Sequence, residues 1–299
     1  MGREDFTILN EYSIGKILSA SNMNQGNTSN AKLINTSQDK YILRKIKDKK
    51  QAITEYLISK KLLKHQITSE ILLSKNNLPF VIKNSGIYNL QRYIEHYPIK
   101  IEEINFSILG ETIAFFHSEA VDIKGIYEQE DRFLLNRLWK EVEHSIQSIE
   151  IKIKKQLVEL INECFNYKHK SNCYIHSDLG IWNLLINKNK IYLIDFGEVR
   201  KGNNHFDIAA ILSSTLKMND EDYQIITNIN EFRDGYLKKF NDFDWSILRE
   251  NLNLWFTRGM LALIINKGIN QATQELLEKI MDQRNKLDGI LMDHIKKKR

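Results

Sequence analysis

The chain has 299 residues, of which 42% are hydrophobic and 27% are charged, and its formal net charge is +5. This balance supports a packed core in one large domain or two lobes, and it argues against a largely disordered chain. Apart from residues 296–299, the basic residues are spread along the sequence, so no nucleic-acid-binding surface is indicated.

The two cysteines, Cys164 and Cys173, have a spacing that fits no zinc or redox motif. Residues 1–5 are charged and lack the apolar core of a signal peptide, and the longest apolar run, residues 260–265, is too short to span a bilayer. We therefore expect a cytoplasmic protein that binds no membrane and no nucleic acid. The sequence leaves open whether it is a monomer or a homodimer.

The first hundred residues are predicted to form a small antiparallel sheet with one helix. Strand-like composition covers 12–46, in three segments separated by a Ser- and Asn-rich loop over 19–30 and a short turn. Apolar residues recur at helical spacing over 50–65. Two further strand-like segments, 79–84 and 87–95, flank a Gly-containing turn and predict a hairpin.

The character of the sequence changes after Pro98. Residues 104–121, most of 129–170 and the chain after Asp207 have helical patterns. A sheet-rich part followed by a helix-rich part predicts an α+β protein with two lobes, divided near residues 95–100.

The segment between these helical regions, residues 172–195, contains three short apolar runs and three polar residues beside them. Asp178 precedes the second run, Asn183 begins it, and Asp195 ends the third. Pairing of the runs as a hairpin is predicted to bring the three side chains to one end of a sheet. Carboxylate and amide oxygens suit Mg²⁺, and a carboxylate can also take a proton from an attacking hydroxyl. The pattern therefore indicates phosphoryl transfer.

The motifs in this part of the chain resemble those of one family of kinases. Residues 176–183, with the sequence HSDLGIWN, are followed by Asp-Phe-Gly at 195–197 and by Phe-Asp-Ile-Ala at 206–209. Together with the helical segment 109–118, they resemble the aminoglycoside phosphotransferase and choline kinase family. The resemblance extends along the whole chain in element order and is specific mainly in 105–215.

The resemblance implies a bilobal protein-kinase-like fold. Residues 1–97 would form a nucleotide-binding lobe with a small antiparallel sheet. Residues 98–299 would form a mainly helical catalytic and substrate-binding lobe.

The resemblance also implies roles for the residues of the central segment. Asp178 would be the catalytic base that orients the acceptor hydroxyl, and Asn183 and Asp195 would hold Mg²⁺. His176 would be structural, and Asp207 would brace the catalytic loop through hydrogen bonds.

The nucleotide side departs from the family in one residue. The family uses a strand lysine, paired with a helix glutamate, to hold the nucleotide phosphates. This chain has Arg44 at the position that we align with that lysine, with Lys45 as the alternative, and Glu55 as the partner. Neighbouring strand residues point to opposite faces, so only one of the two cations can serve, and an arginine can bind phosphate through two hydrogen bonds.

Two further groups complete the expected nucleotide site. A loop around Gly26, Thr28 and Ser29 would cover the phosphates, although it lacks the repeated glycines of a protein-kinase loop. Tyr93 and Ile94 would offer backbone groups to adenine, again by resemblance.

We expect transfer of the γ-phosphoryl group of ATP or GTP, with Mg²⁺ as cofactor, to a hydroxyl of a small molecule. The first acceptor class is an aminoglycoside or another hydroxylated antibiotic, which would make the protein an antibiotic-resistance enzyme. The alternatives are a metabolic kinase acting on choline, ethanolamine, homoserine or a sugar, and a non-catalytic kinase-fold protein of the spore-coat type. A protein kinase is disfavoured because there is no Ala-Pro-Glu motif and because the segment between 197 and 206 is short.

The acceptor itself is not determined by the sequence. A cationic acceptor needs acidic residues, and an ammonium group or a sugar can pack on aromatic rings. The acidic candidates are Glu128, Glu130, Asp131, Glu198, Asp220, Glu221 and Asp222. The aromatic candidates are Trp139, Tyr236, Trp245 and Trp255, which fit helical core spacing equally well.

Overall fold

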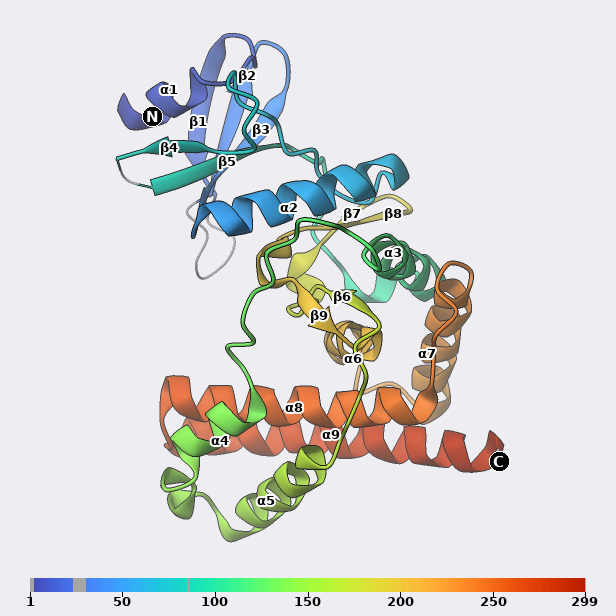
Figure 1. Ribbon diagram of the computed structural model, residues 1–299. Helices are drawn as coiled ribbons and strands as arrows, with labels where there is room; N and C mark the ends of the chain where they lie inside the picture. The colour runs from blue at the N-terminus through green and yellow to red at the C-terminus, as the bar shows by residue number, and fades with distance from the viewer. Residues whose placement is uncertain (1–2, 24–30, 85, 299) are drawn as a thin grey trace. The chain divides into compact units, whose positions relative to one another are not determined.

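The computed structural model describes residues 3–23, 31–84 and 86–298 (Figure 1). The chain divides into two compact units. The first consists of Met1–Lys100, Ser118–Gln129 and Asn183–Val199, and the second consists of Ile101–His117, Glu130–Trp182 and Arg200–Arg299. The first unit therefore takes two short segments from later in the sequence.

The first unit is built on a five-stranded antiparallel sheet with the order β1-β2-β3-β5-β4. Its strands are β1 (Ile17–Asn22), β2 (Ala31–Thr36), β3 (Lys40–Ile46), β4 (Val81–Lys83) and β5 (Gly86–Arg92). Tyr41 and Leu43 share one face of β3 and are buried in a core cluster, and Ile46, on the opposite face, is buried beside Ala52 of the following helix, so both faces of the sheet contribute to the core. The predicted sheet and the hairpin formed by β4 and β5 are confirmed.

Helix α2 (Lys49–Leu62) packs beside β3 and β5. It begins after Asp48, whose carboxylate accepts a hydrogen bond from the Gln51 N–H (2.8 Å) and so satisfies one of the free amides of the first turn. Its buried face includes Ala52, Glu55 and Ile58. The charged Glu55 on this face needs a partner, because an unpaired carboxylate is costly to bury.

The first unit also contains the hairpin of β7 (Leu184–Asn187) and β8 (Lys190–Leu193), which pairs in the register Leu184 with Leu193. The Leu193 N–H donates to the Ile67 carbonyl (2.8 Å), and this bond ties the hairpin to the segment that follows α2. The short 3₁₀-helix η5 (Phe196–Glu198) lies after the hairpin and contacts α2. The chain that leaves the hairpin is thus placed against Glu55's helix.

The second unit is mainly helical. Its long helices include α8, which contacts α4, α5, α6 and α9, so α8 is the central element of the unit (Figure 1). The helices are α3 (Phe106–Glu119, whose last two residues belong to the first unit), α4 (Leu135–Val142), α5 (Ile151–Phe165), α6 (Asn204–Thr215), α7 (Asp222–Leu237), α8 (Trp245–Lys267) and α9 (Gln271–Lys298). The remaining elements of the chain are helix α1 (Arg3–Leu9), strands β6 (Cys173–Ile175) and β9 (Arg200–Gly202), and 3₁₀-helices η1 (Leu63–His65), η2 (Ile101–Glu103), η3 (Ser145–Ser148) and η4 (Ile181–Asn183).

The α+β prediction is therefore confirmed, with an antiparallel sheet in the first hundred residues and helices in most of the rest. None of the helices in the described ranges is both long and apolar enough to cross a membrane.

Two local predictions were wrong. The first strand was predicted over 12–18, but β1 begins at Ile17 and runs to Asn22, inside the expected loop. Tyr12 and Ile14 are buried in an irregular segment, and Gly15 has φ +75°, which interrupts extended backbone. The apolar alternation there reflects burial without strand pairing.

The second error concerns the central segment. Its three apolar runs were expected to pair with one another, but β6 pairs with β9 instead of with the β7–β8 hairpin. Strand β9 has the sequence RKG, which carries no apolar signal and is only three residues long.

Helices α3 and α7 of the second unit cross at two glycines, where their backbones meet. A Cβ atom added to Gly110 would lie 2.0 Å from the Phe232 carbonyl oxygen, and one added to Gly235 would lie 2.0 Å from the Ser107 carbonyl oxygen. Backbone atoms cannot move aside as a flexible side chain can. The sequence therefore needs glycine at both positions.

We expect Gly110→Ala to lower the free energy of unfolding by about 3 kcal/mol, because the added methyl group must push the two helices apart. Urea unfolding of the variant and the wild type measures the difference. Gly259→Ala is the matched control, since nothing lies within 4 Å of a Cβ at this position of α8. The control should gain up to about 1 kcal/mol from the higher helix propensity of alanine. Equal effects of the two substitutions would contradict the close helix crossing.

Candidate functional site

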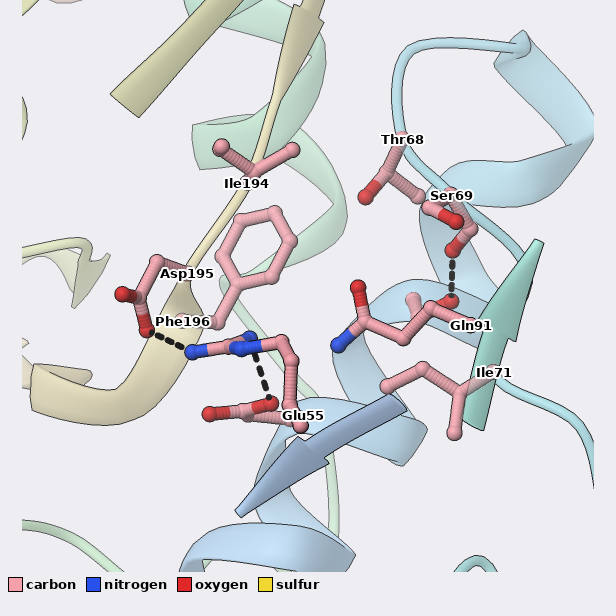
Figure 2. Close-up of a pocket in the computed structure, with 10 residues that line it drawn as sticks. Glu55, Thr68, Ser69, Ile71, Gln91, Ile194, Asp195 and Phe196 are labelled. Carbon is pink, nitrogen blue, oxygen red and sulfur yellow. Dashed lines mark hydrogen bonds and ion pairs between the residues drawn. The ribbon is translucent and has the colours of Figure 1, made fainter. Parts of the chain in front are cut away.

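In the first unit, one guanidinium joins two carboxylates. Nη1 of Arg44 lies 3.3 Å from Oε2 of Glu55, and Nη2 lies 2.7 Å from Oδ1 of Asp195 (Figure 2). Arg44 comes from β3, Glu55 from α2, and Asp195 from the end of the β7–β8 hairpin. The structure thus brings together three residues that the sequence singled out, across 151 positions of the chain.

The three charges differ in exposure. The Glu55 side chain is 1% exposed, Arg44 is 18% exposed and Asp195 is 47% exposed. Burial alone would lower the pKa of Arg44, but the charges of Glu55 and Asp195 outweigh it and raise that pKa above its ordinary value. Burial raises the pKa of Glu55, against the opposing effect of the Arg44 charge. Arg44 is therefore a fixed positive charge, and this charge stabilises the ionised form of the buried Glu55 carboxylate.

Glu55 has two further partners. Gln51 Nε2 donates to its Oε1 (2.8 Å), and Asn89 Nδ2 donates to its Oε2 (3.2 Å). Asn89 lies directly opposite Arg44 in the β3–β5 ladder. A Cβ atom at Gly197 would lie 2.5 Å from Gln51 Nε2, so glycine at this position leaves room for the side chain that holds Glu55.

A pocket opens beside this group of charges. Figure 2 shows Gln91, Ile71, Thr68 and Ser69 on one side of it, and Ile194, Asp195 and Phe196 on the other. Its empty volume is about 220 Å³. This volume includes space that is open to solvent, so the pocket is a small opening beside the charged group.

Asn183 and Asp195 lie at neighbouring points of the backbone. The Ile194 N–H donates to the Asn183 carbonyl oxygen (3.1 Å) across the hairpin, directly before Asp195. Asp195 itself has φ +64°, which is rare for a residue other than glycine and costs about 1–3 kcal/mol. Such strain is kept where the surrounding structure imposes it, and the ion pair to Arg44 is one such restraint.

The donor set of Asn183 and Asp195 fits Mg²⁺. Amide and carboxylate oxygens are hard ligands, and Mg²⁺ commonly keeps waters or phosphate oxygens in its remaining positions. Across 3–23, 31–84 and 86–298, no group of three or more His, Cys, Asp or Glu side chains could hold a metal ion. A cation here would therefore depend on phosphate oxygens as well as on the protein.

In the second unit, Asp207 of α6 holds the loop that carries Asp178. Its Oδ2 accepts the His176 N–H (2.6 Å), and its Oδ1 accepts the Ser177 N–H (2.9 Å). Ser177 has φ +73°, and Asp178 follows it half-buried. His176 is fully buried with its ring edge against Phe116. The loop is therefore fixed from inside the unit.

The Asp207 carboxylate is itself fully buried and belongs to a larger network. His117 Nε2 lies 3.1 Å from its Oδ2, and His117 Nδ1 lies 2.7 Å from the Tyr236 hydroxyl. Asn204 Nδ2 donates to the same hydroxyl (2.9 Å). Burial would raise the pKa of Asp207, but the hydrogen bond and charge of His117 and the contacts with His176 hold it below its ordinary value.

His205, two residues before Asp207, is buried as the neutral imidazole. Its Nε2 accepts the Asp244 N–H (2.7 Å), so its Nδ1 carries the proton and donates to the Asn203 side chain (2.9 Å). Burial lowers its pKa to about 4. Protonation of Nε2 would remove the bond to Asp244 and add a buried charge.

We therefore expect acid to destabilise the protein through His205. The pKa of His205 is about 6.5 in the unfolded chain and about 4 in the folded protein. Between these pH values His205 is protonated in the unfolded chain and neutral in the folded protein, so its contribution to the free energy of unfolding falls as the pH falls. Urea unfolding at pH 7 and pH 5 should show a loss larger by about 2 kcal/mol in the wild type than in His205→Gln. The same loss in both proteins would rule out His205 as the source.

The other residues predicted to bind the nucleotide are those of the phosphate-covering loop and those expected to contact adenine. Gly26, Thr28 and Ser29 lie outside the described residues. The Tyr93 N–H donates to the Lys40 carbonyl (2.9 Å), and the Ile94 carbonyl is 2.8 Å from His96 Nδ1. Both residues follow β5, directly after Arg92.

Among the acidic residues considered for the acceptor, Asp131 is neutralised by two arginines. Its Oδ2 lies 2.9 Å from Arg200 Nη2, and its Oδ1 lies 2.7 Å from Arg258 Nη2. Burial lowers the pKa of Arg258 to about 10, against the effect of Asp131, so Arg258 stays charged at neutral pH. The group carries a net positive charge, and Asp131 cannot attract a cation.

Sequence reasoning missed Arg200 and Arg258. Arg258 is the single charge inside the apolar run LNLWFTRGMLALII of α8, and this isolation was the available signal for a buried ion pair. Of the two alternatives left open for the aromatic candidates, core packing holds for Tyr236, which is fully buried, and the Trp255 ring packs edge-on against Phe206.

Comparison with known proteins gives consistent matches. Residues 105–250 match the family model described as the phosphotransferase enzyme family. The protein LicA homolog of Mycoplasma capricolum is 24% identical over 177 residues, which are 58% of this chain and 69% of that protein.

Solved structures extend the likeness to nearly the whole chain. An amicoumacin kinase in complex with AMP-PNP, Ca²⁺ and Ami matches with a TM-score of 0.71 at 14% identity, over 95% of this chain and 94% of that chain. The choline kinase LicA from Streptococcus pneumoniae matches with a TM-score of 0.57 at 14% identity, over 93% and 94%. At these identities the likeness shows a shared fold, so the predicted kinase-like fold is confirmed.

The match over residues 105–250, together with the shared fold, confirms the resemblance to the aminoglycoside phosphotransferase and choline kinase family and indicates a small-molecule phosphotransferase.

Proposed function

We propose that the protein transfers the γ-phosphoryl group of ATP or GTP to a hydroxyl group of a small molecule. The observation that carries this proposal is the buried Asp207 carboxylate, which accepts the amides of His176 and Ser177 and fixes the loop of Asp178. A loop held in this way presents a carboxylate at a set position, which phosphoryl transfer requires of its base.

On the nucleotide side, residues 1–97 form the nucleotide-binding lobe. Arg44 binds phosphate oxygens through its guanidinium, and Glu55 positions Arg44. The loop of Gly26, Thr28 and Ser29 covers the phosphates, and backbone groups of Tyr93 and Ile94 contact the base.

Asn183 and Asp195 hold the cation. When bound, Mg²⁺ neutralises charge on the nucleotide phosphates and lowers the barrier to their transfer.

On the acceptor side, Asp178 acts as the general base. Its carboxylate accepts the proton of the acceptor hydroxyl as the hydroxyl oxygen forms a bond to the γ-phosphorus. The bond between the γ-phosphorus and the β,γ-bridging oxygen breaks, and the nucleoside diphosphate leaves. The proton on Asp178 then passes to solvent. His176 and Asp207 keep the loop in place during these steps.

We propose a hydroxylated antibiotic, such as an aminoglycoside, as the acceptor. The support for this class is the fold likeness to the amicoumacin kinase, with a TM-score of 0.71 over 95% of this chain. Asp131 is ion-paired, so a cationic acceptor would have to use the other acidic candidates. The panel of antibiotics therefore includes members with many and with few amino groups.

A second candidate is an amino alcohol of the choline type. The observation that favours it is the sequence match to the protein LicA homolog, which covers 58% of this chain.

A coupled assay of nucleoside diphosphate release with Mg²⁺ tests the proposal. ATP and GTP are supplied separately, with a panel of hydroxylated antibiotics, choline, ethanolamine, homoserine and sugars. Acceptor-dependent release that requires an antibiotic supports the first class, and release that requires choline or ethanolamine supports the second. If a parallel titration shows that the protein binds neither ATP nor GTP, the proposed phosphotransferase activity is refuted.

A further inference from the structure

We propose that Arg44 makes cation binding depend on the nucleotide, so that the protein without nucleotide binds a divalent cation weakly. The inference rests on the proposed role of Asp195 as a cation ligand. It goes beyond that role because it assigns to Arg44 the control of when Asp195 is available.

The first step is the geometry of the bridge. Arg44 contacts Glu55 through Nη1 and Asp195 through Nη2, so one guanidinium spans both carboxylates. A planar guanidinium offers separate donors for two acceptors, whereas a lysine ammonium is a single compact charge. Arginine in place of the family's lysine therefore suits the bridge between the helix and the hairpin.

The second step is the charge. Arg44 remains protonated at every pH of interest, and the carboxylates beside it raise its pKa further. A divalent cation on Asp195 would stand next to this fixed positive charge. Glu55 cannot offset the repulsion, because its carboxylate is 1% exposed and is already bound by Gln51, Asn89 and Arg44.

The third step is the effect of phosphate. Nucleotide phosphates attract both the cation and the guanidinium, and arginine binds phosphate in the same forked manner as it binds carboxylates. Their negative charge removes the repulsion and gives Arg44 another partner besides Asp195. Cation and nucleotide then bind with positive coupling, and each raises the affinity for the other by the same factor.

Titration of Mn²⁺, followed by the electron paramagnetic resonance of the free ion, measures this coupling without catalysis. It is done with and without AMP-PNP on the wild type, Arg44→Gln and Lys45→Gln. Lys45→Gln is the matched control, since it removes the same charge from the neighbouring position of β3, where the side chain is exposed and lies against Gly86.

We expect Arg44→Gln without nucleotide to bind Mn²⁺ about tenfold more tightly than the wild type. Lys45→Gln should match the wild type. The ratio of Mn²⁺ affinities with and without AMP-PNP should be about tenfold larger in the wild type than in Arg44→Gln, where only the direct contact between the phosphates and the ion remains. Loss of Arg44 leaves the Glu55 carboxylate buried without its partner cation. The double variant Arg44→Gln, Glu55→Gln removes this buried charge as well. It should bind Mn²⁺ without nucleotide as tightly as Arg44→Gln does.

Asp195→Asn separates the two ideas. If Asp195→Asn weakens Mn²⁺ binding but neither Arg44 variant tightens it, the control by Arg44 is wrong and the cation role of Asp195 stands. If Asp195→Asn leaves Mn²⁺ binding unchanged with AMP-PNP present, the cation role fails and the inference fails with it. If Lys45→Gln gains as much Mn²⁺ affinity as Arg44→Gln, the gain comes from the lower net charge of the protein, and the specific role of Arg44 is wrong.

Discussion

Replacing Asp178 with asparagine is expected to reduce the turnover number by about 10²- to 10⁴-fold, the usual contribution of a positioned general base. The amide has nearly the same volume but cannot accept the proton of the acceptor hydroxyl at neutral pH. The affinity for nucleotide should stay close to that of the wild type, because the proposed nucleotide ligands are all other residues. Steady-state kinetics and a nucleotide titration on the same preparation measure both effects.

Asp234→Asn is the control for this experiment. Asp234 belongs to the same unit, its side chain is 63% exposed, and it forms an ion pair with the adjacent Arg233. This substitution should leave turnover and nucleotide affinity unchanged. Wild-type turnover in Asp178→Asn would mean that another group takes the proton.

Replacing Asp207 with asparagine is expected to lower both stability and turnover. A carboxylate accepts the amides of His176 and Ser177 with separate oxygens, whereas asparagine has one acceptor oxygen and places an N–H group toward the other amide. Removing one partner from a buried charged network costs about 3–5 kcal/mol. The loop of Asp178 should also lose its fixed position, so turnover should fall at temperatures at which the variant is still folded.

The pH dependence gives this prediction a second readout. Because the folded pKa of Asp207 is held below its ordinary value, its contribution to stability is present above the unfolded pKa of about 3.9 and is lost as the pH falls through the folded value. Asp207→Asn should lack this acid-dependent part when its unfolding is compared with that of the wild type from pH 6 to pH 3. An Asp207→Asn variant with the stability and turnover of the wild type would contradict the bracing role.

The sequence was informative where chemistry requires particular residues at fixed spacing. The side chains of Asp178, Asn183 and Asp195 predicted phosphoryl transfer, and the kinase-like fold was predicted from the resemblance of the motifs to those of a kinase family. Apolar runs on either side of a turn predicted the β7–β8 hairpin, since the residues that pair are close in sequence.

The features that were not predicted depend on contacts between distant residues. The pairing of β6 with β9 joins an apolar run to the polar sequence RKG, and nothing local identifies the partner. The ion pair of Arg44 with Asp195 spans 151 positions. In the sequence, Gly110 and Gly235 are only residues with low helix propensity. The close crossing of α3 and α7, which depends on distant parts of the chain, is the reason that both positions need glycine.

The most direct test of the central claim is mass spectrometry of an acceptor incubated with the protein, Mg²⁺ and ATP or GTP. We predict that one hydroxyl of an acceptor from the antibiotic or amino-alcohol classes gains a phosphoryl group, and that Asp178→Asn forms this product far more slowly. The account would be contradicted if the nucleotide is only hydrolysed, every acceptor stays unmodified, and Asp178→Asn hydrolyses the nucleotide as fast as the wild type.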